Sequence, residues 1–229
     1  MYQAITIKEA VQQTFNTVLK ELNGEYSPEI LTGFPEMDKH LPQPSQGTLS
    51  IISSNSDAEA GIMAIKVIKN HLQHTPAVPV LYCSQQSIMS ATSELLQELS
   101  AINVIDIPEN MAQKLDGLTE IVEHIRDYPL YMLPAADMQN AYFYQRVKKA
   151  YEEKKFELLI AQNHQTAGAA NLCDLALELN IPVLLITGES NPKELKKARF
   201  YASRIIQIKS TEKEMIIENV KCSNNCNKQ

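Results

Sequence analysis

Short, fully apolar strand-like segments alternate with helical segments along this sequence, and the alternation limits the folds that the chain can adopt. Val183–Ile186 reads VLLI, with apolar side chains at successive positions. Successive side chains of a strand point to opposite faces of a sheet, so such a run is buried on both faces and needs helices on both sides. Repeated strand–helix units favour parallel pairing with right-handed crossovers. The sequence therefore predicts an α/β fold with a mostly parallel central sheet and helices on both faces.

The predicted elements divide the chain into three parts: a helix and loop over residues 1–29, a core domain over 30–221 and a polar tail over 222–229. The predicted strands are 48–53, 78–84, 130–133, 156–161, 181–187, 204–209 and 214–220, and the predicted helices are 58–73, 87–99, 109–126, 138–155, 168–179 and 192–201. The last two strands are expected to form a C-terminal β-hairpin. Ahead of the core, residues 6–23 predict an amphipathic helix with one apolar face of Ile7, Val11, Phe15, Val18 and Leu22.

Charge and hydropathy exclude some classes of function. The net charge is -6, with 21 Lys and Arg against 27 Asp and Glu. This balance argues against a general nucleic-acid binder, because cations that neutralise phosphates supply most of the affinity. Two basic runs, 146–155 and 193–204, are most simply solvated helix faces, and they leave a weak contact with single-stranded DNA open. No apolar run approaches the roughly 18 residues of a membrane helix, and no signal-peptide pattern begins the chain, so we expect no membrane contact and a cytoplasmic location.

Metal-binding residues are sparse in the sequence. The four cysteines, Cys83, Cys173, Cys222 and Cys226, are scattered, which predicts reduced thiols and no zinc site. His71 and His74 lie one helical turn apart without a third ligand, and we expect both to be exposed helix residues.

The turn after the first predicted strand resembles a failed phosphate-binding loop. In a nucleotide hydrolase this turn reads GxxxxGK[ST], where the Lys neutralises phosphate oxygens and the hydroxyl holds magnesium. Here residues 54–61 read SNSDAEAG, which puts Ala60 at the Lys position and Gly61 at the hydroxyl position. Asp57 and Glu59 would also point negative charge at a triphosphate. The loop that a nucleotide would occupy comprises Ser54, Asn55, Ser56, Asp57, Ala58 and Glu59.

Several short segments occur in an order typical of one family. Leu31–Asp38 reads LTGFPEMD, where that family has TGFxxLD, and Val80–Ser84 reads VLYCS for its VLxFS. Pro129–Tyr131 reads PLY for its PLYI, and Leu175–Val183 reads LALELNIPV for its LAKELNVPV. From about Ile7 to Lys221, the chain resembles the RecA-like motor domain of DnaB-type replicative DNA helicases, with the preceding linker helix. The resemblance implies a RecA-like P-loop NTPase fold.

Transfer of the family's functional residues onto this chain finds most of them replaced. Gln86 stands where the family has a catalytic Glu, and Gln162 stands where it has a magnesium-linked Asp. Thr187-Gly188 takes the place of the residues that sense the γ-phosphate. Lys221 keeps a positive charge at the arginine-finger position. With Ala60, Gly61, Gln86 and Gln162 at the key positions, we predict no catalytic residues, no ATP hydrolysis, and loss of the family's ATP and Mg²⁺ cofactors.

Three functions follow as hypotheses. The first is a non-catalytic relative of the helicase motor that acts through protein contacts in DNA replication. By the resemblance, the apolar face from Ile7 to Leu22, together with Lys221, would contact a second copy of the chain or a replicative helicase. Alternatively, that helix folds back on its own domain. The second hypothesis is an ATP-dependent DNA helicase with an atypical nucleotide site. The third is a nucleotide- or small-ligand-sensing module that uses the turn after Ser53.

Overall fold

The computed structural model describes residues 7, 32, 34, 37, 38, 46–100, 119, 122, 123, 125–135, 137–189, 191–210 and 215–220. The strands are β1 (Leu49–Ser53), β2 (Val80–Ser84), β3 (Leu130–Pro134), β4 (Leu158–Asn163), β5 (Val183–Thr187), β6 (Arg204–Ser210) and β7 (Met215–Val220). The helices are α3 (Asp57–His74), α4 (Ile88–Ser100), α6 (Ala141–Lys154), the 3₁₀ turn η1 (Thr166–Gly168), α7 (Ala169–Leu179) and α8 (Pro192–Ala198).

The described strands form one sheet in the order β3-β2-β4-β5-β1-β6-β7. All neighbours pair in parallel except β6 and β7, which are antiparallel. The mostly parallel sheet and the C-terminal hairpin are therefore confirmed. The register aligns Ser53 with Thr187, Thr187 with Asn163, and Gln162 with Ser84, so the carboxyl ends of β1, β5, β4 and β2 meet at one edge.

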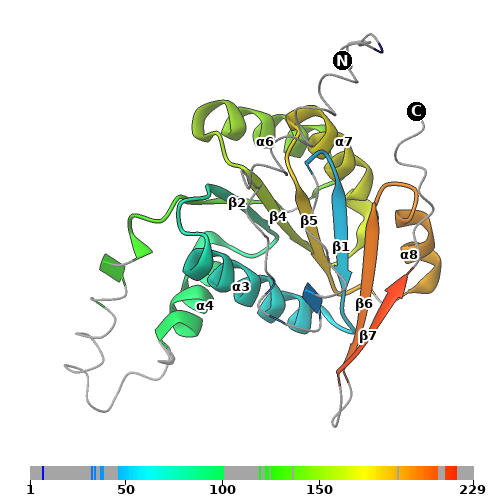
Figure 1. Ribbon diagram of the computed structural model, residues 1–229, viewed down its shortest axis with the longest axis horizontal. Coiled ribbons are helices and arrows are strands. Elements are labelled where there is room, and N and C mark those ends of the chain that lie inside the picture. The colour runs from blue at the N-terminus through cyan, green and yellow to red at the C-terminus, as the bar shows by residue number, and fades with distance from the viewer. Residues whose placement is uncertain are drawn as a thin grey trace.

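Helices cover both faces of the sheet, as the apolar strands require. Helices α3 and α4 pack on one face, and α6, α7 and α8 pack on the other (Figure 1). Within β1, Ile51 faces the layer of α6, α7 and α8, while Ile52 faces α3 and α4. Both side chains are fully buried. The double burial that the apolar runs predict is thus confirmed.

Local sequence signals fix where several helices begin and end. The Asn140 side chain caps α6, and the Asn191 side chain caps α8, where Pro192 occupies the first turn. Lys155 and Asn180 end α6 and α7 in the left-handed conformation. As a result, α6 begins at Ala141, three residues later than the sequence pattern indicates.

One prediction about exposure is wrong. The sequence pattern predicts an exposed His71, but its side chain is 2% exposed. It shares the inner face of α3 with Ala64, Val67 and Ile68, which recur at helical spacing. His74 is exposed as predicted.

Several other predictions fall partly or wholly outside the described residues. Of the N-terminal helix only Ile7 is described: it is helical and 80% exposed. Val11, Phe15, Val18, Leu22, Lys221 and the tail are outside the described part, as is most of the predicted helix 109–126. Of the four cysteines, Cys83 and Cys173 lie in the described part, and neither forms a disulfide. Across the described ranges, no helix combines the length and the apolar content needed to cross a bilayer.

Candidate functional site

Three of the positions that the sequence resemblance aligns with catalytic residues lie side by side at the carboxyl edge of the sheet. Gly61 is on α3, Gln86 follows β2, and Gln162 is near the end of β4. A Cβ atom added to Gly61 would lie 3.3 Å from Nε2 of Gln162 and 3.7 Å from Nε2 of Gln86. The structure therefore brings together the residues that stand for the magnesium hydroxyl, the catalytic Glu and the magnesium-linked Asp.

Gln162 is held in a buried network of neutral groups. The Tyr82 hydroxyl donates to Gln162 Oε1 at 2.7 Å, and Ser84 Oγ donates to the same oxygen at 2.9 Å. Burial raises the pKa of the Tyr82 phenol to about 12, so the phenol remains a neutral donor. The Gln86 backbone N–H donates to Ser84 Oγ at 3.0 Å, which joins the β2 end to this network. The carbonyl oxygen of Gln162 is thus already engaged by two hydroxyl groups.

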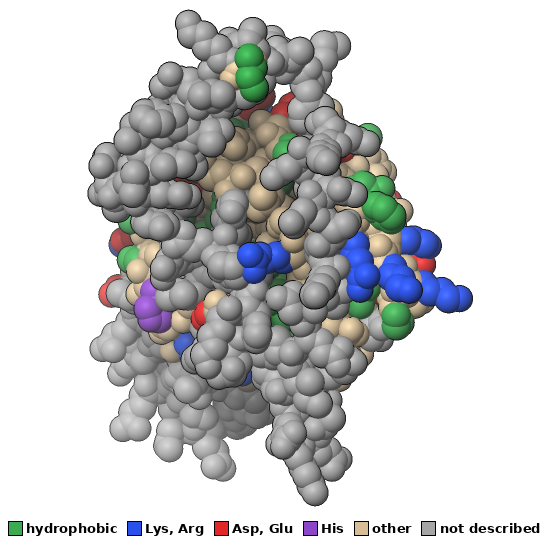
Figure 2. All heavy atoms as spheres, turned by 45° about the vertical axis from the view of Figure 1, so that its right-hand side comes forward, with side chains coloured by type: hydrophobic (Ala, Val, Ile, Leu, Met, Phe, Trp, Pro, Cys, Tyr) green, Lys and Arg blue, Asp and Glu red, His purple; other side chains and the backbone are tan. Residues whose placement is uncertain are grey.

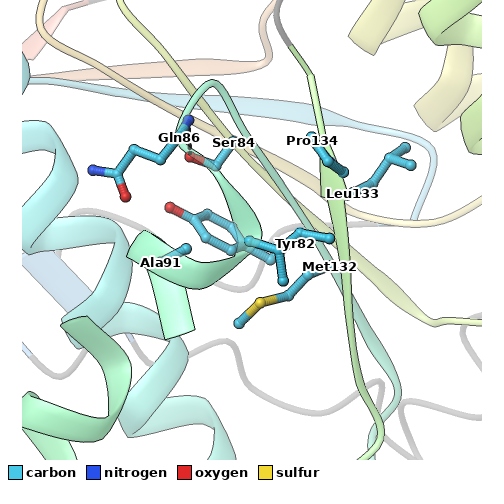
Figure 3. A pocket seen from close by; sticks show the side chains of 8 residues that line it. Tyr82, Ser84, Gln86, Ala91, Met132, Leu133 and Pro134 are labelled. Carbon is cyan, nitrogen blue, oxygen red and sulfur yellow. Dashed lines mark hydrogen bonds between the residues drawn. The ribbon is translucent and has the colours of Figure 1, made fainter. Parts of the chain in front are cut away.

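The space beside this network is small. Figure 3 shows Ser84 and Gln86 beyond the hydroxyl end of the Tyr82 ring, with Met132 beside the ring. The cavity lined by these residues has a volume of 10 Å³. A void of this size holds about one water molecule. The void lies beside β2, β3 and α4 and does not include the turn between β1 and α3.

The turn between β1 and α3 is shorter than a phosphate-binding loop. Only Ser54, Asn55 and Ser56 connect the two elements, and Asp57 already begins the helix. The Ser56 side chain caps α3 by accepting the Glu59 backbone N–H at 3.2 Å. The Glu59 carboxylate in turn accepts the Asn55 backbone N–H at 3.2 Å. The Asn55 backbone N–H of the turn is therefore already hydrogen-bonded to a carboxylate of the chain itself.

The sequence carries a signal for this closed turn that the motif alignment overlooks. Ser56-Asp57-Ala58-Glu59 has the S-x-x-E spacing of a capping box, which marks the beginning of a helix. Alignment with a phosphate-binding loop instead assigns these residues to a loop that continues to Glu59. Because the helix starts at Asp57, Ala60 faces inward and is 1% exposed within the core beneath α3. A longer side chain at this Lys position would point into that core.

The loop after β5 packs directly on the turn. The Ser54 backbone N–H donates to the Thr187 carbonyl oxygen at 2.8 Å. A Cβ atom at Gly188 would lie 2.5 Å from the Asp57 backbone nitrogen and 2.6 Å from the Ser56 carbonyl carbon. Real Cβ atoms do not approach backbone this closely, so glycine is required for the contact. Gly188 therefore covers the first N–H group of α3.

The two acidic residues in the first turn of α3 have partners of their own. Asp57 Oδ2 lies 2.7 Å from Nδ1 of His164, which follows β4. The partner of Glu59 is the Asn55 N–H. Among the described residues, no group of three or more His, Cys, Asp or Glu side chains could hold a metal ion. The expected interface residues Lys221 and Val11–Leu22 cannot be placed relative to this site, since they lie outside the described part.

The order of the sheet, the helices on both of its faces and the hairpin at its end define the RecA-like class of α/β fold. A solved ATPase domain from a DnaB-like helicase is similar in structure, with a TM-score of 0.72 and 13% sequence identity over 96% of this chain and 92% of that chain. A DnaB-like replicative helicase, solved with its interactions with primase, is similar with a TM-score of 0.65 and 12% identity. This second match covers 95% of the present chain but only 64% of the helicase chain.

Comparison of the sequence with protein-family models and with curated proteins gave no match. At identities of 12–13%, the structural likeness establishes the fold and not the activity. The chain thus has the RecA-like fold of DnaB-type helicase ATPase domains, as the sequence resemblance implied.

Proposed function

We propose that this chain is a DnaB-helicase-like RecA domain that acts through protein contacts in DNA replication and does not hydrolyse ATP. The observation that carries the proposal is the closed turn between β1 and α3. Glu59 occupies the Asn55 N–H, and the Gly188 backbone covers the Asp57 N–H. A phosphate group needs these donors, and a carboxylate in their place repels it.

Loss of the magnesium ligands supports the same proposal. Gly61 offers no hydroxyl, and Gln162 is a neutral amide whose oxygen already accepts two hydrogen bonds. Magnesium is normally held by carboxylates, hydroxyls and substrate phosphates, so these residues do not fit it. Without the metal and the phosphate Lys, no group on the described part of this edge would stabilise the charge of a phosphoryl-transfer transition state.

A role through protein contacts requires neither ATP nor magnesium, so it is compatible with the closed turn. One structural neighbour was solved with its interactions with primase, and we infer that this chain also has a replication protein as its partner. The candidates are a replicative helicase or a second copy of the chain. In this proposal, residues 1–29 form the linker-type segment with the apolar face Ile7–Leu22, residues 30–221 form the RecA-like core, and 222–229 form a tail.

Phosphate release with Mg-ATP, with and without single-stranded DNA, tests the catalytic half of the proposal. We expect no turnover above background. We also expect no rise in melting temperature with ATP, although a ligand at 100 times its Kd would stabilise the fold by about 2.7 kcal/mol. DNA-stimulated turnover that is lost in Lys221→Ala would instead support an ATP-dependent helicase. Stabilisation by a nucleotide without turnover would support a sensing module.

Size-exclusion chromatography with light scattering tests the protein-contact half. The chain is measured alone and mixed with the replicative helicase of its own organism. We expect either a self-associated species or a mixed complex. A strict monomer that does not bind the helicase would remove this part of the proposal.

A further inference from the structure

Helix α8 and the turn after it present cations and aromatic rings on one surface. The α8 surface comprises Lys193, Lys196, Lys197, Arg199, Phe200 and Tyr201. Its three lysines are exposed, Phe200 is 71% exposed and Tyr201 is 42% exposed. In Figure 2, Lys and Arg side chains gather with apolar ones on the side of the molecule that carries α8 in Figure 1.

The core fixes the orientation of this surface. Leu195, Ala198 and Ala202 are each at most 3% exposed and anchor α8 and its following turn to the layer that also contains α7. Leu195 and Ala198, three residues apart, lie on one face of α8. The lysines therefore project from the opposite face, and the backbone that carries them is already held in place by the core.

The charge of this surface is opposite to that of the rest of the chain. Residues 192–201 carry four Lys and Arg and one Glu, a net charge of +3. The remaining residues carry 17 Lys and Arg against 26 Asp and Glu, a net charge of -9. Among the described residues, one acid pairs with a lysine of the α8 surface: the Glu194 carboxylate lies 2.7 Å from Lys197 Nζ. Lys193 and Lys196 remain to attract an anionic partner.

The dimensions of the surface favour a short acidic segment over a nucleic acid. Seven helical residues extend about 10 Å, and successive phosphates of one B-DNA strand are spaced about 3.4 Å along the helix axis. A strand of more than a few nucleotides would extend beyond the α8 surface, and the net charge of -9 on the remaining residues disfavours a polyanion. A short acidic segment would not, and an apolar side chain within it would cover Phe200, whose ring is otherwise largely in water.

We propose that the α8 surface binds a short acidic segment of a partner protein, with carboxylates at Lys193 and Lys196 and an apolar side chain on Phe200. The inference rests on the proposed function, since it takes the chain to act through protein contacts. The α8 surface belongs to a different element from the closed turn between β1 and α3.

Fluorescence anisotropy with a labelled peptide of repeated Glu-Glu-Leu triplets tests the inference on the full chain. We expect the double variant Lys193→Glu/Lys196→Glu to weaken binding by at least about tenfold, and Phe200→Ala to weaken it by about threefold or more. The matched control is Lys149→Glu/Lys155→Glu, which changes the net charge equally at exposed positions on and after α6. The control should stay within about twofold of the unmodified chain.

Four outcomes would overturn the inference: no peptide binding, equal losses in both double variants, tighter binding of oligothymidylate that also depends on Lys193 and Lys196, or a change of oligomeric state in the α8 variant alone. The last two would assign the surface to nucleic acid or to a second copy. Circular dichroism of each variant checks folding. ATP turnover would contradict the proposed function without affecting peptide binding, so the two failures are distinguishable.

Discussion

Gln162 shows how one residue changes what the carboxyl edge of the sheet can do. A carboxylate at this position would attract a cation, whereas the amide carbonyl satisfies the hydroxyls of Tyr82 and Ser84. Gln162 is 6% exposed, and a buried charge without a metal would carry a desolvation cost. The neutral network thus stabilises the fold at a position where the sequence resemblance would place a magnesium-linked Asp.

Gly188 is the residue whose replacement should damage the closed turn most. We expect Gly188→Ala to lower the free energy of unfolding by about 1–3 kcal/mol, because its Cβ would overlap the backbone of Ser56 and Asp57. Gly61→Ala is the matched control, since its Cβ would meet the ends of the Gln162 and Gln86 side chains, at 3.3 and 3.7 Å, and no backbone atom is among these contacts. Alanine also favours the helix by about 1 kcal/mol. Urea denaturation measures both variants. An unchanged Gly188→Ala midpoint would show that the β5 loop does not press on the turn.

The residues of the site are partly predictable from the sequence. Gly61, Gln86 and Gln162 converge as expected, because parallel strands bring their carboxyl ends to one edge. The partners of the acidic residues are not predictable. Asp57 and Glu59 are expected to repel a phosphate, but Asp57 pairs with His164, and Glu59 accepts a backbone N–H. No sequence spacing links Asp57 to His164, since the contact depends on the sheet order, in which β5 lies between β4 and β1.

Among the elements, the start of α3 decides the shape of the turn. Strand runs and the hairpin can be predicted because apolar periodicity and pairing act locally. The start of α3 lies at Asp57, one residue before the predicted Ala58, because the capping signal of Ser56 begins the helix inside the eight-residue motif. The capping signal at Ser56 therefore predicts the start of α3 better than the alignment with an eight-residue phosphate-binding motif does.

Removal of the α3 cap should have a measurable cost. We expect Ser56→Ala to destabilise the protein by about 1 kcal/mol, because the Glu59 N–H loses its acceptor. Ser93→Ala in the middle of α4 is the control: Ser93 Oγ donates to the Met89 carbonyl, and its loss leaves no unpaired N–H. That variant should be neutral or slightly stabilising, since alanine favours a helix. Equal effects in chemical denaturation would contradict the capping role.

At the scale of the whole molecule, the structure shows a RecA-like fold, whereas the loss of nucleotide binding is our proposal. The sheet order and both helical layers match those of helicase ATPase domains at 12–13% identity. Apolar burial and strand order determine this architecture, and many sequences can supply them. The site depends on a few side chains, so it can change while the fold persists. Conserved architecture is therefore compatible with a role in binding other proteins.

The burial of His71 makes the stability of the whole molecule depend on pH. Desolvation lowers the pKa of His71 below its ordinary value of 6.5 in the folded protein. Between the folded and unfolded pKa values, the unfolded chain binds the proton and the folded chain does not, so the free energy of unfolding falls as pH falls through this window. Above pH 6.5 the imidazole is mostly neutral in both states, and this contribution to stability is fully present.

Replacement of His71 should flatten this part of the pH profile. We expect His71→Gln to lose less stability than the unmodified chain between pH 7 and about pH 5, because glutamine takes up no proton in either state. The matched control is His74→Gln, one turn further along α3 at an exposed position, and it should follow the unmodified chain. Urea midpoints across this range measure the effect. Parallel pH profiles for His71→Gln and the unmodified chain would mean that burial of the imidazole does not couple folding to pH.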